Sequence, residues 1–147
     1  MANRCDIPTA HFRHRLPLQI RFNDIDMLGH LNNSVYLTFM DLAKTRYFQA
    51  VLGDKLNFGR FGVVIVNINC DFCVPTFYDD DIECETAVVA IGEKSLTLEQ
   101  RIVMPSTGEV KCRCRTVMSG FDAKTMASAP ITDEWRQALE EYEGKKF

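Results

Sequence analysis

The stretch RFNDIDMLGHLNNSVYLTFMDLAKTRYFQAVLG, residues Arg21 to Gly53, decides the fold. Asn32, Asn33 and Ser34 are good N-cap residues, because their side-chain oxygens can accept hydrogen bonds from the free N–H groups of a first helical turn. Gly53 is typical of the position just after a helix ends. The two ends predict one long helix between them, about 27 Å in length at a rise of 1.5 Å per residue.

Most side chains of this predicted helix are apolar, and the polar ones form a single narrow stripe. A helix that is apolar nearly all round is usually buried. We therefore expect a sheet that wraps along the helix rather than one partner element. The polar stripe consists of Ser34, Thr38, Asp41, Thr45 and Gln49.

The flanking sequence supplies strands for such a sheet. Five segments alternate apolar and polar residues, and turn residues separate them. The first begins at Pro17 and runs to Asn23, and residues 1–15 before it show no period, which predicts a loose arm. The other four cover about 63–72, 82–91, 96–103 and 110–118, with Gly120 expected to bend or end the last.

A short helix from Thr132 to Tyr142, with Thr132 as its cap, closes the chain. The order of strand, long helix, four strands and short helix is typical of an α+β layer with one antiparallel sheet. A length of 147 residues fits a single domain over residues 1–147.

Composition and charge exclude several classes of partner. The chain is 46% hydrophobic and 25% charged, which are globular values, and its net charge of −3 gives no basic field for nucleic acid. No apolar segment approaches a membrane-spanning length, and the first residues contain no signal-peptide core. We expect a cytoplasmic protein with no nucleic-acid or membrane partner.

Six cysteines in a chain without a signal peptide favour reduced thiols over a disulfide framework. Cys70 and Cys73 are three apart in a predicted strand and so point to opposite faces. Cys112 and Cys114 share a strand face, but no second pair with metal-ligand spacing accompanies them. The sequence therefore predicts free thiols and no metal site.

Candidate catalytic groups cluster between the first strand and the long helix. Helix N-terminal N–H groups and the positive end of the helix dipole favour a developing oxyanion there. A neighbouring carboxylate could serve as nucleophile or general base, and Asp26 is the candidate. Alternatives stay open: Asp24 could only tie the turn, His30 could only hydrogen-bond the loop, and all three could ligate a metal.

This segment resembles the signature of the 4-hydroxybenzoyl-CoA thioesterase branch of the hotdog-fold acyl-CoA thioesterases. The resemblance covers about residues 17–122 in order. It implies the hotdog fold, in which a five-stranded antiparallel sheet wraps round one long central helix. The matching positions are Arg21-x-x-Asp24-x-Asp26-x-x-Gly29-His30-x-Asn32-Asn33-x-x-Tyr36, Ala43-x-x-Arg46/Tyr47, Val74-Pro75 with Tyr78-x-Asp80, and Ile91-Gly92-x-Lys94-Ser95-Leu96.

The resemblance implies catalytic roles for three residues. It gives Asp26 the part of nucleophile or general base. It also implies that a backbone amide at the helix start polarises the thioester carbonyl, and the amide of Asn33 is the best candidate. His30 belongs to the same catalytic turn.

The resemblance also implies a substrate site. Gly29 and Tyr36 would help to shape the acyl pocket. Lys94 and Ser95 lie where members of the family often contact coenzyme A, although a solvated hairpin lysine would look the same.

We therefore expect an acyl-CoA thioester hydrolase that needs no cofactor, because coenzyme A is part of the substrate. Its single sheet leaves unpaired edges, so a homodimer or homotetramer with the site between protomers is expected. The alternatives are a thioesterase for acyl groups on acyl-carrier protein and a hotdog protein that binds acyl-CoA without hydrolysing it.

Overall fold

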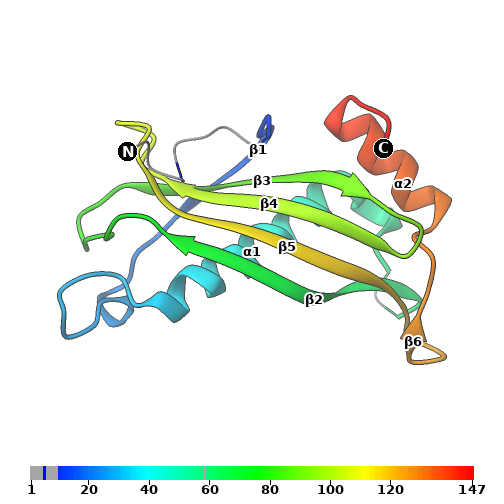
Figure 1. Ribbon diagram of the computed structural model, residues 1–147, viewed down its shortest axis with the longest axis horizontal. Helices are drawn as coiled ribbons and strands as arrows, with labels where there is room; N and C mark the ends of the chain where they lie inside the picture. The colour runs from blue at the N-terminus through cyan, green and yellow to red at the C-terminus, as the bar shows by residue number, and fades with distance from the viewer. Residues whose placement is uncertain (1–4, 6–9, 58) are drawn as a thin grey trace.

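The chain folds as one antiparallel sheet against which a long helix packs (Figure 1). The computed structural model describes residues 5, 10–57 and 59–147. Its elements are β1 (His14–Leu18), α1 (Asn33–Leu52), β2 (Phe61–Phe72), β3 (Ile82–Ile91), β4 (Ser95–Val103), β5 (Val110–Asp122), β6 (Ala127–Ser128) and α2 (Asp133–Glu143). Single 3₁₀ turns cover Phe22–Asp24 and Gly53–Lys55.

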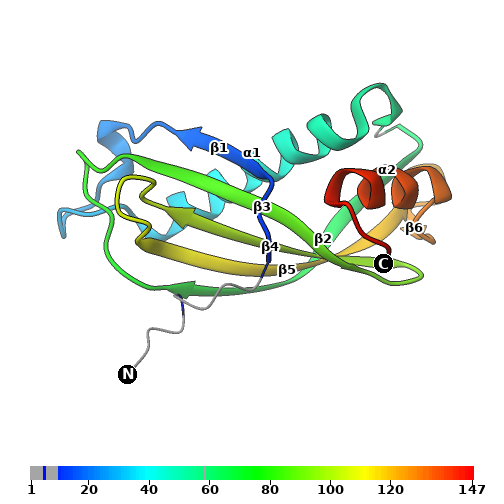
Figure 2. The same cartoon turned by 90° about the horizontal axis from the view of Figure 1, so that it is seen from above.

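The sheet has the strand order β1-β3-β4-β5-β2, with β6 paired to β5, and every pairing is antiparallel. The two views show the sheet curving along one side of α1, while α2 covers the end where α1 finishes (Figures 1 and 2). The predicted α+β architecture is confirmed. The short β1 and the long β2 form the two edges of the main sheet.

The ends of α1 are where the sequence predicted them. The Asn32 Oδ1 accepts a hydrogen bond from the Ser34 N–H at 3.0 Å, and Gly53 forms the C-cap. The expectation of burial all round is wrong, because the sheet covers only one side and leaves Leu37 and Leu42 37% and 46% exposed. The buried side consists of Tyr36, Phe39, Met40, Ala43, Lys44, Tyr47, Phe48 and Leu52.

The first strand lies earlier than predicted. It begins at His14, inside the arm predicted to be loose, and its pairing with β3 ends at Leu18. Phe22, expected on a strand face, is 82% exposed in a 3₁₀ turn. Phe12 is buried beneath the Arg101 guanidinium, 4.6 Å from its ring centre, so this part of the arm packs on the sheet. Residues 1–4 and 6–9 of the predicted arm lie outside the described residues.

An irregularity interrupts β2. The register with β5 shifts between Ile65 and Asn67, which leaves Val66 as an extra residue. The predicted alternation therefore fails at this point, and Ile65 and Ile68 line the same cavity. Val66 is 59% exposed on this edge strand.

Two apolar clusters fill the space between the sheet and the helices. One lies beneath the first half of α1, and the other joins its second half to α2. The predicted cap of α2 is confirmed, because the Thr132 Oγ1 accepts from the Trp135 N–H at 3.2 Å. Among the residues that the structure describes, no helix has the length and apolar character needed to cross a membrane.

Candidate active site

The loop before α1 holds the Asp26 carboxylate in place. Its Oδ1 accepts a hydrogen bond from the Leu28 N–H at 2.9 Å. The Asp26 N–H donates to the His30 carbonyl at 3.1 Å, and the Gly29 N–H donates to the Asp26 carbonyl at 3.0 Å. Gly29 has a φ of 84°, a left-handed conformation that favours glycine. The turn therefore fixes the direction of the carboxylate.

The second oxygen of this carboxylate faces the helix start. The Asn32 Nδ2 donates to the Asp26 Oδ2 at 3.3 Å, while the Asn32 Oδ1 caps the helix. The next residue, Asn33, opens α1, and no hydrogen bond among the described residues uses its N–H. The Asp26 carboxylate therefore contacts Asn32, and the next residue, Asn33, offers a free N–H at the positive end of the helix dipole.

A pocket of about 180 Å³ opens beside this helix start. The structure brings three predicted site residues to it, namely His30, Asn33 and Tyr36. The Tyr36 hydroxyl donates to the Thr76 Oγ1 at 2.9 Å, and burial raises the pKa of Tyr36, so the phenol stays protonated. The remaining lining residues are Leu31, Phe72, Cys73, Val74 and Pro75.

The connection between β2 and β3 forms the other wall, which the sequence analysis did not assign to the site. The Thr76 carbonyl accepts from the Leu31 N–H at 2.7 Å, which ties this connection to the Asp26 loop. The buried Lys111 Nζ donates to the Pro75 carbonyl at 3.1 Å and lies 3.3 Å from the Asp80 Oδ2. Asp80 is therefore half of an ion pair with Lys111. The Val74-Pro75 and Tyr78-x-Asp80 motifs were the available signal.

Asp24 ties the turn. Its buried carboxylate accepts from the Arg21 backbone N–H at 2.8 Å and from the Arg21 guanidinium at 3.1 Å. Burial by itself would raise the pKa of Asp24, but the hydrogen bonds and charge of Arg21 outweigh it and hold this pKa below its ordinary value of 3.8. These contacts favour the structural alternative for Asp24.

Asp24→Asn should lower the melting temperature by several degrees at neutral pH. Because the folded pKa is depressed, the carboxylate stabilises the fold above its unfolded pKa, and this contribution disappears as pH falls through the lower folded pKa. Thermal unfolding across pH should show the gap from wild type narrowing below about pH 4. The exposed Asp79 provides a control in Asp79→Asn, and an equal loss there would contradict the role of Arg21.

Lys94 and Ser95 lie far from this pocket within one chain. Lys94 belongs to the turn between β3 and β4, and Ser95 is the first residue of β4, at the other end of the sheet from the Asp26 loop (Figure 1). Ser95 pairs with Ser119 of β5, whereas Phe72 at the pocket pairs with Cys112. Cys112 and Ser119 are separated by about 23 Å along an extended strand. The predicted contact of Lys94 and Ser95 with coenzyme A thus needs a second protomer and stays a prediction.

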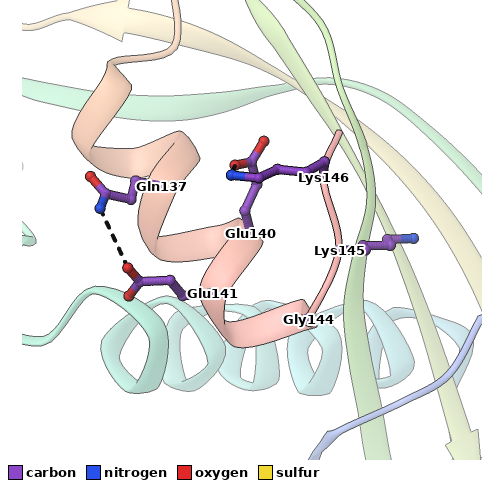
Figure 3. A pocket seen from close by; sticks show the side chains of 6 residues that line it. All are labelled: Gln137, Glu140, Glu141, Gly144, Lys145 and Lys146. Atoms are coloured by element: carbon purple, nitrogen blue, oxygen red, sulfur yellow. Dashed lines mark hydrogen bonds and ion pairs between the residues drawn. The ribbon is translucent and has the colours of Figure 1, made fainter.

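Two larger hollows lie away from the Asp26 loop. One, of about 370 Å³, lies at the end of α2, where the Lys146 Nζ contacts the Glu140 carboxylate at 3.0 Å (Figure 3). The other, of about 480 Å³, includes Lys55 and Arg60 beside the start of β2. Neither contains a predicted site residue.

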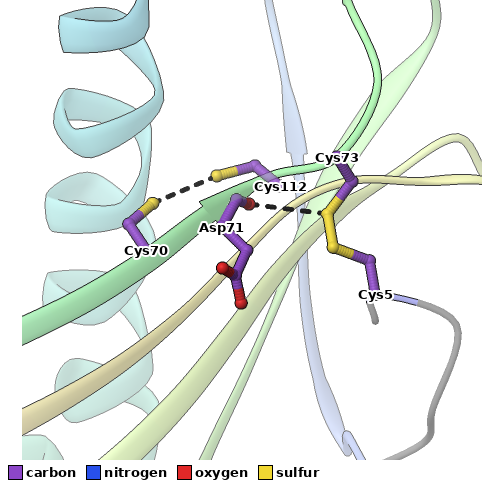
Figure 4. Close-up of a disulfide and its surroundings, with 5 residues drawn as sticks. All are labelled: Cys5, Cys70, Asp71, Cys73 and Cys112. Atoms are coloured by element: carbon purple, nitrogen blue, oxygen red, sulfur yellow. Dashed lines mark hydrogen bonds between the residues drawn. A yellow bond between two sulfur atoms is a disulfide. The ribbon is translucent and has the colours of Figure 1, made fainter. Parts of the chain in front are cut away.

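The cysteines differ from the expectation. Cys5 and Cys73 form a disulfide, so the prediction that every thiol is free is wrong (Figure 4). This bond joins the N-terminal segment to the pocket wall. Cys112 and Cys114 lie beside a third cysteine, because Cys70 of β2 pairs with Cys114 across the two strands. Elsewhere in the described ranges, Asp24, Asp26 and His30 do not gather their ligand atoms into such a group.

Comparison with known proteins identifies the family of this chain. The thioesterase-like superfamily matches residues 20–139, and the chain belongs to it. The predicted enzyme class, a thioester hydrolase, is confirmed with that membership.

Curated relatives and solved structures agree with this family assignment. The long-chain acyl-CoA thioesterase FadM of Escherichia coli is 25% identical over 130 residues, which cover 84% of this chain and 95% of FadM. The acyl-CoA thioesterase YbgC of Haemophilus influenzae is 27% identical over 105 residues, 67% of this chain and 77% of YbgC. A thioesterase from Thermus thermophilus, solved with coenzyme A and zinc, is 30% identical with a TM-score of 0.81, covering 92% of this chain and 98% of its own. The predicted hotdog fold is confirmed.

Proposed function

We propose that the protein hydrolyses acyl-CoA thioesters to a carboxylic acid and free coenzyme A. One observation carries the proposal: the Asp26 carboxylate is held against Asn32, one residue from the unused Asn33 N–H, beside a pocket. The acyl-CoA thioesterases FadM and YbgC support the choice of coenzyme A as the carrier. We also propose that the reaction uses no cofactor and takes place in the cytoplasm.

The arrangement suits attack on a thioester carbonyl. The carbonyl oxygen of the thioester accepts a hydrogen bond from the Asn33 N–H. The helix dipole stabilises the negative charge that develops on this oxygen. Asp26 then either attacks the carbonyl carbon itself or removes a proton from an attacking water. Collapse of the tetrahedral intermediate breaks the carbon–sulfur bond, and the thiolate of coenzyme A leaves and takes up a proton. If water attacks, this step gives the carboxylic acid directly. If Asp26 attacks, it gives an anhydride between the acyl group and Asp26, which water then hydrolyses to the carboxylic acid and the free Asp26 carboxylate. His30 and Tyr36 line the pocket beside the reacting group.

Release of free thiol tests this proposal. Acyl-CoA substrates of different chain length, aliphatic and aromatic, should each be compared with the same acyl group on acyl-carrier protein. Faster turnover of the coenzyme A substrates supports the proposal, and faster turnover of the carrier-protein substrates would replace it by the first alternative. Tight binding of acyl-CoA without thiol release would establish the second alternative, a binding protein.

We propose further that the protein acts as a homodimer or a larger even assembly. β2 is a twelve-residue edge strand, and its side chains are mostly exposed. Natural proteins rarely leave so long an edge unpaired. If two copies pair antiparallel along β2, the Phe61 end of one strand lies beside the Phe72 end of the other. Such pairing would bring the hollow with Lys55 and Arg60 toward the pocket of the other copy and could bring Lys94 closer to it.

Sedimentation should therefore show a dimer or tetramer at micromolar concentrations. The physical reason is the unpaired edge of β2, which another copy can satisfy by backbone hydrogen bonds. A protein that stays monomeric across this range would contradict the assembly and would leave Lys94 without a route to the substrate.

A further inference from the structure

Three cysteines lie together on the face of the sheet that α1 covers. Cys70 of β2 pairs directly with Cys114 of β5, and Cys112 lies two residues away on the same face. The Sγ atoms of Cys70 and Cys112 are 3.4 Å apart (Figure 4). All three Sγ atoms, that of Cys114 included, lie within 4.8 Å of one another. Cys112 and Cys114 are buried, while Cys70 is half-buried.

We propose that Cys70, Cys112 and Cys114 bind a thiophilic d¹⁰ cation, with Zn²⁺ as the probe. Tetrahedral Zn²⁺ has Zn–S bonds of about 2.3 Å, which places two ligating sulfurs roughly 3.8 Å apart. The Sγ separations, 3.4 Å between Cys70 and Cys112 and no more than 4.8 Å for the other two pairs, are compatible with this value. Three thiolates and no carboxylate form a ligand set that selects soft metals over Mg²⁺ or Ca²⁺.

The surroundings can complete the coordination. A cavity of about 150 Å³ is lined by Cys114 and Lys44, among others, and is large enough for several waters, since one water takes up about 30 Å³. A water there can supply the fourth ligand. Lys44 is a buried cation on α1, which pairs with Asp41 at 3.1 Å. Lys44 lines the same cavity as Cys114, so a cation lies on that side of the proposed site.

Binding is a proton exchange and not a redox step. Three Zn–S bonds form, three S–H bonds break, and the three protons pass to solvent. The ion would join β2 to β5 behind the Tyr36–Phe72 pair, whose ring centres are 5.5 Å apart. Its role is therefore to hold the pocket wall, and the proposed hydrolysis does not depend on it.

The test uses the full chain in buffer that contains a phosphine reductant. The protein is loaded with Zn²⁺, and gel filtration then removes the excess Zn²⁺. We expect one retained ion per chain and a higher melting temperature than that of the chelator-treated protein. Cd²⁺ titration should give a thiolate-to-metal ultraviolet band that saturates at the same ratio. Cys70→Ser should weaken binding by about 100-fold or more, since even groups that only orient a ligand are worth about 10- to 100-fold.

Two variants serve as controls. Cys84→Ala removes a buried cysteine of β3 that is outside the triad, and Cys73→Ser removes the disulfide partner. Both should keep the ion and the charge-transfer band. Cys70 is the most accessible member of the triad, so Cys70→Ser should disturb the fold least. Thermal unfolding checks that this variant is folded. Wild type that retains no Zn²⁺, or Cys70→Ser that binds as tightly as wild type, would overturn the proposal.

Discussion

Asp26→Asn should lower kcat on the best acyl-CoA substrate by on the order of 100-fold or more. In the wild type, the Asp26 Oδ1 accepts a hydrogen bond from the Leu28 N–H at 2.9 Å. Asparagine keeps the size of the side chain and an oxygen that can accept this hydrogen bond. It loses the basic oxygen that the reaction needs. The fold should survive, because a loop substitution outside a core usually changes the free energy of unfolding by under about 1 kcal/mol.

Asp24→Asn is the matched comparison, because it makes the same chemical change two residues away. Asp24 contacts Arg21 rather than the helix start, so its loss should appear in thermal unfolding and only mildly in kcat. Turnover near wild type in Asp26→Asn would defeat the assignment. A rate loss confined to Asp24→Asn would move the chemical role to that residue.

Gly120→Ala should destabilise the fold by about 2–3 kcal/mol. A Cβ at this position of β5 would collide with the Ala129 carbonyl oxygen and lie 3.2 Å from the Phe61 ring. The Gly120 N–H also donates to the Lys94 carbonyl at 2.7 Å, and its carbonyl accepts from the Ala129 N–H, so the backbone has little freedom to move away. Chemical denaturation measures the loss, and the melting temperature should fall by roughly 5–10 °C.

Gly59→Ala is the control for this experiment. Its Cβ would meet only the Asn57 Oδ1, at 3.3 Å, in an exposed turn. We expect little change or a small gain in stability, because alanine restricts the unfolded chain more than glycine does. Equal stability of Gly120→Ala and Gly59→Ala would show that the close approach of Ala129 does not constrain β5.

Gly120 also shows where prediction from the sequence ended. The sequence predicts that the strand bends or ends at this residue, but β5 continues to Asp122. A glycine in a strand pattern can mark a bend or a close approach of another segment, and only the fold distinguishes them. The ends of α1 were predictable because capping by Asn32 and Gly53 is local chemistry.

Contacts between distant strands could not be predicted in the same way. The triad of Cys70, Cys112 and Cys114 depends on the register between β2 and β5, which no spacing along a single strand reveals. The position of Lys111 beneath Pro75 likewise depends on strand pairing. The Asp26 loop was predictable as a candidate because its groups are close in sequence. The wall that Thr76 forms was signalled only by the Val74-Pro75 and Tyr78-x-Asp80 motifs, and its contact with the Asp26 loop depends on the fold.

A single comparison tests the central claim most directly. Wild type and Asp26→Asn are each mixed with a large excess of acyl-CoA, and free thiol and free carboxylic acid are both followed with time. We predict that wild type releases the two products in equal amounts over many turnovers, while the variant releases them on the order of 100-fold more slowly. Wild type that releases no thiol while it binds acyl-CoA, or a variant as fast as wild type, would contradict the claim.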